Sequence, residues 1–120
     1  MILVTSPLYH VNGFAYASPP LLEGARSYVM EKFDAAQAVE LIERHEISHT
    51  VMVPTMLQRV GRLPDLRPEQ FASIRRLVYG GAKVPEWVVD RFLELMPPEA
   101  FIFIYGSSER LGVTEMTGAE

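Results

Sequence analysis

The densest group of reactive residue types lies at residues 105–109, where the sequence reads Tyr-Gly-Ser-Ser-Glu. A tyrosine ring can stack on a nucleotide base, and the glycine beside it lets a ligand approach the backbone closely. Serine hydroxyls can donate hydrogen bonds to phosphate oxygens, and a carboxylate can hold a Mg²⁺ ion that those oxygens coordinate. The group indicates nucleotide and magnesium binding, but a plain turn followed by a helix N-cap would use the same residues.

Three small residues, Gly80, Gly81 and Ala82, directly follow an apolar run at residues 76–79. Small side chains allow a flat ligand or a phosphate to come within contact distance of the backbone. An isolated pair of glycines is also typical of a tight turn. The sequence contains neither the Gly-Lys-Ser/Thr phosphate loop nor the Gly-x-Gly-x-x-Gly dinucleotide pattern, so any phosphate here would be bound in another way.

A third group surrounds His10, which follows an apolar N-terminal run and precedes Gly13. On a loop at a ligand-binding edge, an imidazole can hydrogen-bond a carboxylate or form an aromatic wall. A half-buried imidazole bonded to the backbone is the alternative. The Val-Pro-Thr sequence at residues 53–55 predicts only a turn and a helix cap.

Alternating strands and helices are predicted to position these groups. Continuous apolar or β-branched runs predict strands at residues 1–5, 27–30, 50–53, 76–79 and 101–104. Apolar residues at helical spacing predict helices at about residues 35–45, 55–62 and 85–95. This alternation is typical of an α/β fold with a mostly parallel sheet covered by helices on both faces. Such sheets bind ligands beyond the carboxyl ends of their strands, which is where all three groups lie.

Two local patterns predict helix ends. Asp34 followed by Gln37 is a capping-box-like start for the helix that follows. Another helical stretch begins near Val11, but the Ser-Pro-Pro sequence at residues 18–20 is predicted to end it and to start a new turn.

Composition excludes several classes of protein. The chain has 120 residues, of which 48% are hydrophobic, and its net charge is −4. These values fit one folded domain or a piece of one, and they do not fit a disordered chain or an electropositive nucleic-acid-binding surface. The lack of cysteine excludes disulfides, thiolate metal sites and an acyl-cysteine intermediate. No stretch approaches the ~20 apolar residues that a transmembrane helix needs.

Taken together and in order, four segments resemble the adenylate-forming acyl-CoA synthetase superfamily: residues 7–13, 53–55, 80–82 and 105–109. Each motif is short, but their order and spacing match over essentially the whole chain. Residues 112–118, which read Gly-Val-Thr-Glu-Met-Thr-Gly, further resemble the bacterial fatty-acid and bile-acid CoA ligases. The resemblance implies a cytoplasmic ligase that uses ATP, Mg²⁺ and coenzyme A to activate a small-molecule carboxylic acid.

The resemblance also implies roles for individual residues. Tyr105 would lie against the adenine, Ser108 would donate to the α-phosphate, and Glu109 would bind Mg²⁺. His10 would lie beside the acyl carboxylate and would form the catalytic set together with Ser108 and Glu109. The remaining candidates would line the two ligands. The nucleotide-binding candidates are Gly80, Gly81, Ala82 and Gly106. The acyl-pocket candidates are Leu8, Val11, Gly13 and Gly106.

In the implied reaction, the carboxylate attacks the α-phosphate of ATP and releases pyrophosphate, and the CoA thiol then displaces AMP. The family's Ser/Thr/Gly-rich phosphate loop lies upstream of the first motif, and its lysine-bearing C-terminal domain lies downstream of the last. We therefore expect residues 1–120 to be a single α/β fragment of the large N-terminal AMP-binding domain, without the C-terminal domain and inactive alone. Because a truncated sheet exposes apolar faces and strand edges, we also expect self-association.

Two other interpretations remain open. The segment His45-Glu46-Ile47-Ser48-His49 matches a zinc-hydrolase pattern, which requires both histidines on one helical face. The predicted helix ends near the first of these histidines, which argues against zinc binding. A non-enzymatic flavodoxin-like binding or interaction module would have a similar size, although receiver domains of that type place acidic residues after the first strand, where this chain has Thr5-Ser6-Pro7.

Overall fold

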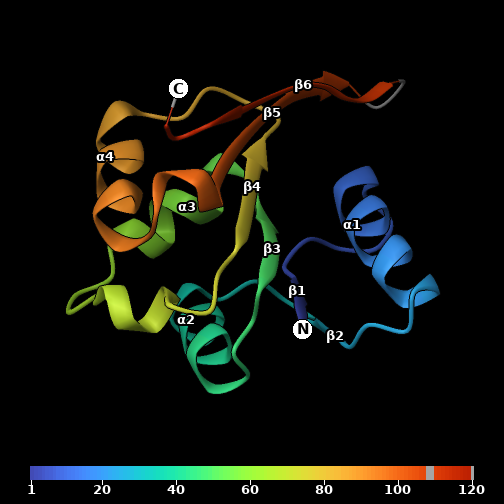
Figure 1. Cartoon of the computed structure of the whole chain (residues 1–120), viewed down its shortest axis with the longest axis horizontal. Coiled ribbons are helices and arrows are strands. Elements are labelled where there is room, and N and C mark those ends of the chain that lie inside the picture. Colours follow the sequence, from blue (N-terminus) through green and yellow to red (C-terminus); the bar gives the residue numbers. More distant parts are fainter. Residues whose placement is uncertain (108–109, 120) are drawn as a thin grey trace.

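The computed structural model describes residues 1–107 and 110–119, with side chains for all of these except residues 12, 106, 107 and 110–114. Its centre is one sheet with the strand order β2-β1-β3-β4-β5-β6 (Figure 1). Strands β1 to β5 run parallel, and β6 pairs antiparallel with β5. The strands are β1 (Ile2–Val4), β2 (Ser27–Val29), β3 (His49–Met52), β4 (Arg76–Gly80), β5 (Phe101–Ser107) and β6 (Arg110–Thr117).

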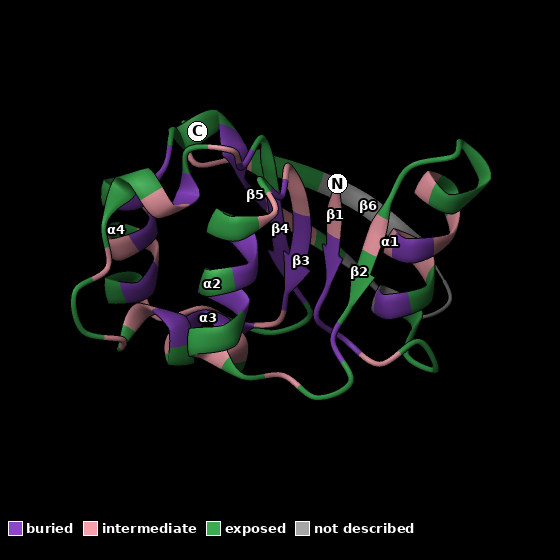
Figure 2. Cartoon of the chain, turned by 90° about the horizontal axis from the view of Figure 1, so that it is seen from below, coloured by how far each residue is buried: buried purple, intermediate pink, exposed green. Residues whose placement is uncertain are grey.

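Helices cover the two faces of this sheet unequally. Figure 2 shows α2, α3 and α4 on one side of the strands and α1 on the other. The helices are α1 (Val11–Leu22), α2 (Ala35–Arg44), α3 (Pro54–Gly61) and α4 (Glu86–Leu95), with short 3₁₀ turns η1 (Pro68–Phe71) and η2 (Pro98–Ala100). None of the described helices is long and apolar enough to cross a membrane. The predicted α/β class with a mostly parallel, helix-covered sheet is confirmed.

The larger core fills the face covered by α2, α3 and α4. Leu3, Leu77 and Phe101 of the sheet pack there with Ile42 of α2 and Phe92 of α4, and all five side chains are fully buried. Burying a large apolar side chain in this way contributes about 1.5–3 kcal/mol. The stability of the fold therefore rests mainly on this face.

A smaller apolar cluster lies under α1. Val51, Val78 and Ile102 form one row across β3, β4 and β5, and Tyr16 and Ile104 pack against this row. Successive residues of a strand point to opposite faces of the sheet. The continuous apolar runs in the sequence therefore supply both clusters at once.

The predicted start of α2 is confirmed. The Asp34 carboxylate accepts a hydrogen bond of 2.8 Å from the backbone N–H of Gln37, and the helix begins at the next residue after this cap. Helix α3 begins at Pro54, where proline is favoured because the first N–H of a helix has no partner within the helix.

The predicted break near Ser18 is wrong, because α1 continues through Pro19 and Pro20 to Leu22. The Ser18 hydroxyl does not cap a new turn. It donates instead to the carbonyl of Phe14, at 2.8 Å, within the same helix. The carbonyls of both prolines accept hydrogen bonds from the N–H groups that follow the helix, so the last turn closes normally.

Strand β6 and the extension of β5 beyond residue 104 were not predicted. The sequence of β6 has no apolar run, and its strand conformation follows from pairing with β5. Phe103 pairs with Met116, and Ile104 pairs with Glu115. The hairpin also brings Glu115 to Arg76 of β4, with a nitrogen-to-oxygen distance of 3.2 Å.

Candidate functional site

The strand order identifies the edge of the sheet at which a ligand is expected. The parallel strands follow the order β2-β1-β3-β4-β5, which is the order of flavodoxin-like doubly wound sheets. In this arrangement ligands bind outside the carboxyl ends of the strands, next to the point between β1 and β3 where the connections change direction. The loop that carries His10 follows β1 directly, and residues 53–55 follow β3.

The carboxyl end of β4 lies beside the middle of β5 at this edge. Gly80, the last residue of β4, pairs with Ile104, so Gly81 follows β4 next to Tyr105, which is still within β5 and pairs with Thr114 of β6. The structure thus brings the glycine group and the tyrosine together. Ser108 and Glu109 lie outside the described residues.

Both glycines at the carboxyl end of β4 have a structural reason to be glycine. A Cβ atom at Gly80 would lie 2.3 Å from the carbonyl oxygen of Ile104, so a side chain there would force β4 and β5 apart. Gly81 has φ of 91°, and a Cβ atom there would meet nothing within 4 Å. Ala82 is exposed. The loop therefore leaves open surface beside Gly81 and Ala82 that a flat ligand can occupy.

Tyr105 differs from the buried aromatic residues of β4 and β5. Tyr79 stacks on Phe101 with ring centroids 4.1 Å apart, and both rings are buried. Tyr105 exposes 66% of its surface, and its ring touches no other described aromatic ring. Its ring is therefore available to stack on a ligand. Gly106 follows it in the backbone of β5.

His10 lies at the N-cap position of α1, with φ of −85° and ψ of 145°. Its imidazole is exposed, and its ring centroid lies 4.8 Å from that of Tyr9. No described residue accepts or donates a hydrogen bond at this imidazole. The alternative of a half-buried imidazole bonded to the backbone is therefore wrong, and the side chain is accessible to a ligand.

The other acyl-pocket candidates around His10 differ in how far they are exposed. Leu8 and Val11 are exposed by 49% and 37%, so both can contact a ligand. Gly13 is buried, and a Cβ atom there would lie 2.2 Å from the carbonyl oxygen of Pro7. Gly13 thus allows the first turn of α1 to pack closely on the loop after β1.

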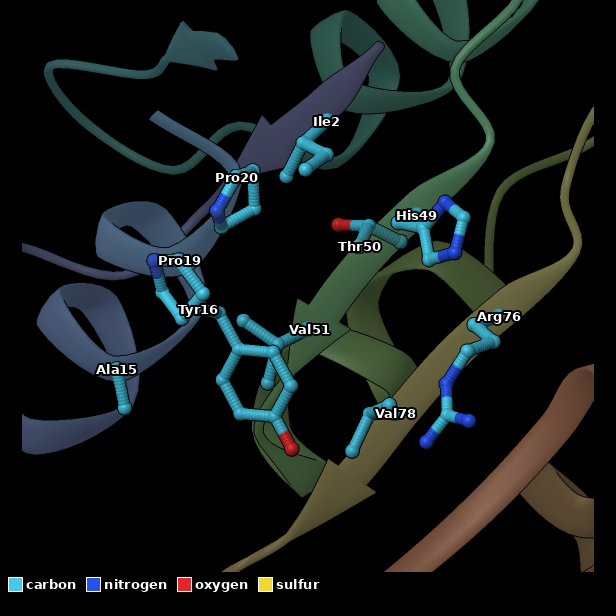
Figure 3. Close-up of a pocket in the computed structure, with 10 residues that line it drawn as sticks. All are labelled: Ile2, Ala15, Tyr16, Pro19, Pro20, His49, Thr50, Val51, Arg76 and Val78. Atoms are coloured by element: carbon cyan, nitrogen blue, oxygen red, sulfur yellow. The ribbon is translucent and has the colours of Figure 1, made fainter. Parts of the chain in front are cut away.

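A pocket of about 240 Å³ lies between α1 and the sheet (Figure 3). One wall consists of residues of α1, and the floor consists of the first residues of β1, β3 and β4. The lining residues are Ile2, Ala15, Tyr16, Pro19, Pro20, His49, Thr50, Val51, Arg76 and Val78. Sequence reasoning missed this pocket, because its residues are dispersed along the chain and meet only through the pairing of Ile2 with His49 and of His49 with Arg76.

Apolar atoms form most of the pocket surface, and its ionisable lining residues are Tyr16, His49 and Arg76. Arg76 forms an ion pair with Glu115. Burial raises the pKa of the Tyr16 hydroxyl, and Glu115 raises it further, whereas Arg76 acts in the opposite direction. Burial and the charge of Arg76 lower the pKa of His49, whose Nδ1 lies 2.8 Å from the Ser48 hydroxyl. At neutral pH, Tyr16 is therefore protonated and His49 is neutral.

The histidine pair of the zinc-hydrolase interpretation does not share a helical face. Helix α2 ends at Arg44, and Glu46 has φ of 50°, which takes the backbone out of the helix before His49 begins β3. His45 stacks on Tyr28 with ring centroids 5.3 Å apart. Within residues 1–107 and 110–119, no group of three His, Cys, Asp or Glu side chains is placed to hold a metal ion. The geometry that zinc hydrolysis requires is not formed.

Comparison with known proteins places this chain and its fold in one family. The family model for AMP-binding enzymes matches residues 1–120. The chain is 30% identical over 115 residues to 4-coumarate–CoA ligase-like 6 of Oryza sativa subsp. japonica, an alignment that covers 95% of this chain and 19% of that protein. It is 30% identical over 107 residues to the medium/long-chain-fatty-acid–CoA ligase FadD8 of Mycobacterium tuberculosis, covering 89% of this chain and 18% of that protein. The amide bond synthetase McbA of Marinactinospora thermotolerans has the same fold, with a TM-score of 0.86 and 28% identity over 98% of this chain and 24% of that chain.

The parallel sheet with the strand order β2-β1-β3-β4-β5 thus defines a doubly wound type of α/β protein. More narrowly, the chain belongs to the AMP-binding enzyme family, within the adenylate-forming acyl-CoA synthetase superfamily. The resemblance drawn from the four short motifs is confirmed. The chain spans about a fifth of the length of the curated relatives that it matches.

Proposed function

We propose that the chain is part of an ATP-dependent ligase that joins a carboxylic acid, specifically a fatty acid, to coenzyme A through an acyl-adenylate. Family membership and the similarity to a fatty-acid–CoA ligase support this chemistry. The observation that carries the proposal is the pairing of Gly80 with Ile104. This pairing brings the open surface at Gly81 next to the exposed Tyr105 in the neighbouring strand, and the adenine would lie between them.

The proposed reaction has two steps. The acid carboxylate attacks the α-phosphorus of ATP, so that an oxygen–phosphorus bond forms and the bond to pyrophosphate breaks. The CoA thiol then attacks the acyl carbon, loses its proton to the solvent and displaces AMP. Neither step requires a cysteine of the enzyme, which agrees with the sequence.

Residues of this chain would bind and orient the reactants. Tyr105 would stack on the adenine, and His10 would hold the acid carboxylate at the carboxyl end of β1. Ser108 would donate a hydrogen bond to the α-phosphate, and Glu109 would bind Mg²⁺. The Mg²⁺ ion would neutralise charge on the phosphate oxygens when bound. Gly80, Gly81, Ala82 and Gly106 would line the nucleotide, and Leu8, Val11, Gly13 and Gly106 would line the acid.

We further infer that residues 1–120 form one α/β unit of the large N-terminal AMP-binding domain of a cytoplasmic enzyme. Acting alone, this unit would bind ligands without completing the reaction. Phe14 and Leu22 of α1 expose 64% and 89% of their surfaces, and exposed apolar side chains of this kind favour self-association. Sustained pyrophosphate release by the purified chain, given ATP, Mg²⁺ and a fatty acid, would contradict its inactivity.

Calorimetric titration with a non-hydrolysable acyl-adenylate mimic tests the proposed nucleotide site. We expect the unmodified chain to bind the mimic and Tyr105→Ala to weaken binding by about 1–3 kcal/mol, because stacking of a base on an aromatic ring contributes about that much. Tyr28→Ala is the matched control, since Tyr28 is also an exposed tyrosine but lies on β2, at the opposite edge of the sheet. Equal weakening in both variants, or no binding by the unmodified chain, would contradict the proposal.

A further inference from the structure

Helix α1 contains no charged residue, unlike the three helices on the opposite face of the sheet. Residues 1–22 include no Asp, Glu, Lys or Arg, whereas α2, α3 and α4 expose charged side chains such as Glu40, Arg59 and Asp90. A surface helix normally presents a polar or charged face to the solvent, and a helix that is apolar all round is normally buried. The composition of α1 therefore indicates that its outer face is covered as well as its inner face.

The outer face of α1 carries a stripe of apolar residues. Ala17 is buried on the inner side of the helix, whereas Val11, Phe14 and Leu21 are exposed by 37%, 64% and 58%. Together with the half-buried Ser18, these residues follow one another at intervals of three, four and three residues. That spacing places all four on one side of a helix. We call Val11, Phe14, Ser18 and Leu21 the outer stripe.

The apolar surface around the outer stripe is large enough for one side of a stable dimer interface. Leu8 and Tyr9, which precede the helix, and Leu22, which ends it, are exposed by 49%, 85% and 89%. With the stripe, they present on the order of 750 Å², if a fully exposed large side chain presents ~200 Å². The largest apolar patch of a typical monomer is ~300–600 Å². Each partner of a specific complex buries ~800 Å², so the surface at α1 matches an interface better than a solvated face.

The spacing of the outer stripe is the same when it is read from either end. Two copies of α1 that cross antiparallel about a two-fold axis therefore bring Phe14 of one copy opposite Ser18 of the other, and Val11 opposite Leu21. The large ring of Phe14 then meets a small side chain. The Ser18 hydroxyl already donates to the carbonyl of Phe14 in its own helix, so it needs no water or partner across the contact. An identical helix thus complements the stripe in size and leaves no polar group unbonded.

Charge also favours a second copy as the partner. Around a two-fold axis, any charged residue near the centre of the contact lies close to its own duplicate, and the two charges repel each other. The outer stripe avoids this repulsion because α1 carries no charge. Figure 1 shows α1 at one side of the molecule, apart from the other helices, so a second copy can approach it.

We propose that two copies of the chain form a dimer in which the outer stripes of α1 pack antiparallel against each other around a two-fold axis. This inference rests on the self-association proposed above, not on the ligase chemistry. An interface of this kind uses the same surface of both copies, so it closes at two and leaves no stripe free to add a third.

Sedimentation equilibrium of the purified chain tests the dimer. We expect a monomer–dimer equilibrium with a Kd on the order of 10 µM, the weak end of the range for interfaces of this size. Raising the NaCl concentration from about 0.05 M to about 0.5 M should tighten the dimer, because salt screens the repulsion between two copies of net charge −4. A contact held by ion pairs would weaken instead.

Two variants of equal net charge locate the interface. Phe14→Lys should weaken the dimer by at least about tenfold, because it places a charge at the centre of the apolar contact. Tyr28→Lys is the matched control, since Tyr28 is an exposed apolar residue of β2, outside α1. It should leave the Kd within about twofold of that of the unmodified chain, as surface substitutions away from a contact do.

An exchange of two side chains tests the antiparallel register. Phe14→Ser alone should weaken the dimer by at least about tenfold, because a large buried contact is lost. Phe14→Ser combined with Ser18→Phe exchanges the two partners of each contact and should restore the Kd to within about threefold. At about 1 µM the chain is monomeric, so urea denaturation there should give all variants a stability within about 0.5 kcal/mol of the unmodified chain and show that they are folded.

The outcomes separate this inference from the ligase proposal. A monomer at every concentration, growth beyond two copies, equal weakening by Phe14→Lys and Tyr28→Lys, or an exchanged variant as weak as Phe14→Ser would overturn it. The variants keep Tyr105, so binding of the acyl-adenylate mimic can be measured on each. A monomeric chain that binds the mimic would contradict the dimer and support the nucleotide site. A dimer that does not bind the mimic would do the reverse.

Discussion

The two faces of the sheet are packed by different means. On the α2–α4 face, Phe101 lies between Tyr79 and Phe92, with ring centroids 4.1 Å and 5.3 Å away, and all three side chains are buried. On the α1 face, the branched side chains of Val51 and Val78 meet a single helix, and a pocket of about 240 Å³ is left between them. One face is closed by three helices, and the other is left partly open.

The closed face therefore contributes mainly to the stability of the fold, and the open face is available for ligand binding. Filled packing provides most of the free energy of folding, and it tolerates little change in volume. The open face gives up part of that free energy and gains space lined mainly by apolar groups. The segments after β1 and β4 lie at the same carboxyl edge, where the candidate site is, while the closed face holds the strands in place.

Removing a large side chain from the closed face should have the largest effect. Phe92→Ala should lower the free energy of unfolding by about 3–5 kcal/mol, because a buried phenylalanine leaves a cavity when it is truncated. Phe92 is 0% exposed, whereas Phe14 on the outer side of α1 is 64% exposed. Phe14→Ala is therefore the matched control, with an expected change within about 0.5 kcal/mol. Urea denaturation measures both, and equal losses would contradict the assignment of stability to the closed face.

Adding one methylene group to each face compares their free space directly. Val60 of α3 is fully buried in the closed face, so Val60→Ile should destabilise the chain by about 1–3 kcal/mol through overpacking. Val78→Ile adds the same group to the floor of the pocket, and filling a cavity should stabilise the chain by about 0.5 kcal/mol. Urea denaturation of the two variants should thus give changes of opposite sign. A loss at Val78 as large as that at Val60 would mean that the α1 face is also filled.

The sequence allowed prediction of the elements whose signals are local. Asp34 and Gln37 sit three residues apart, so the cap that starts α2 could be recognised without knowing the fold. Strand β6 could not be recognised, because it depends on pairing with β5. The continuity of α1 through Pro19 and Pro20 was missed for a similar reason, since it depends on bonds made after the helix rather than on helix propensity.

The candidate site was predictable only in part. Because parallel strands end at one edge, His10, Gly81 and Tyr105 could be assigned to a common edge from the alternation of strands and helices alone. The pocket could not be predicted, since Tyr16 and Arg76 meet across the sheet only in the folded chain. The roles of Ser108 and Glu109 remain predictions from the family resemblance.

The open face should also respond to pH, and this effect should be the smallest of the three. In the folded chain, burial followed by the charges of Arg76, the N-terminus and Arg75 lowers the pKa of His49 from 6.5. The unfolded chain then binds the proton more readily than the folded chain does. The contribution of neutral His49 to stability is therefore fully present above pH 6.5 and is lost as the pH falls through the lower folded pKa.

Urea midpoints measured over this pH range would detect the titration of His49. His49→Gln should flatten the decline in stability on acidification, because glutamine keeps a polar side chain that does not titrate. His45→Gln removes an imidazole at the end of α2, outside the pocket, and should retain the decline. Identical pH profiles for the unmodified chain and His49→Gln would show that the imidazole is as well solvated as in the unfolded chain. The pocket would then be open to water near the amino-terminal ends of the strands. In that case the two faces would differ in their access to water rather than in how much space their packing leaves.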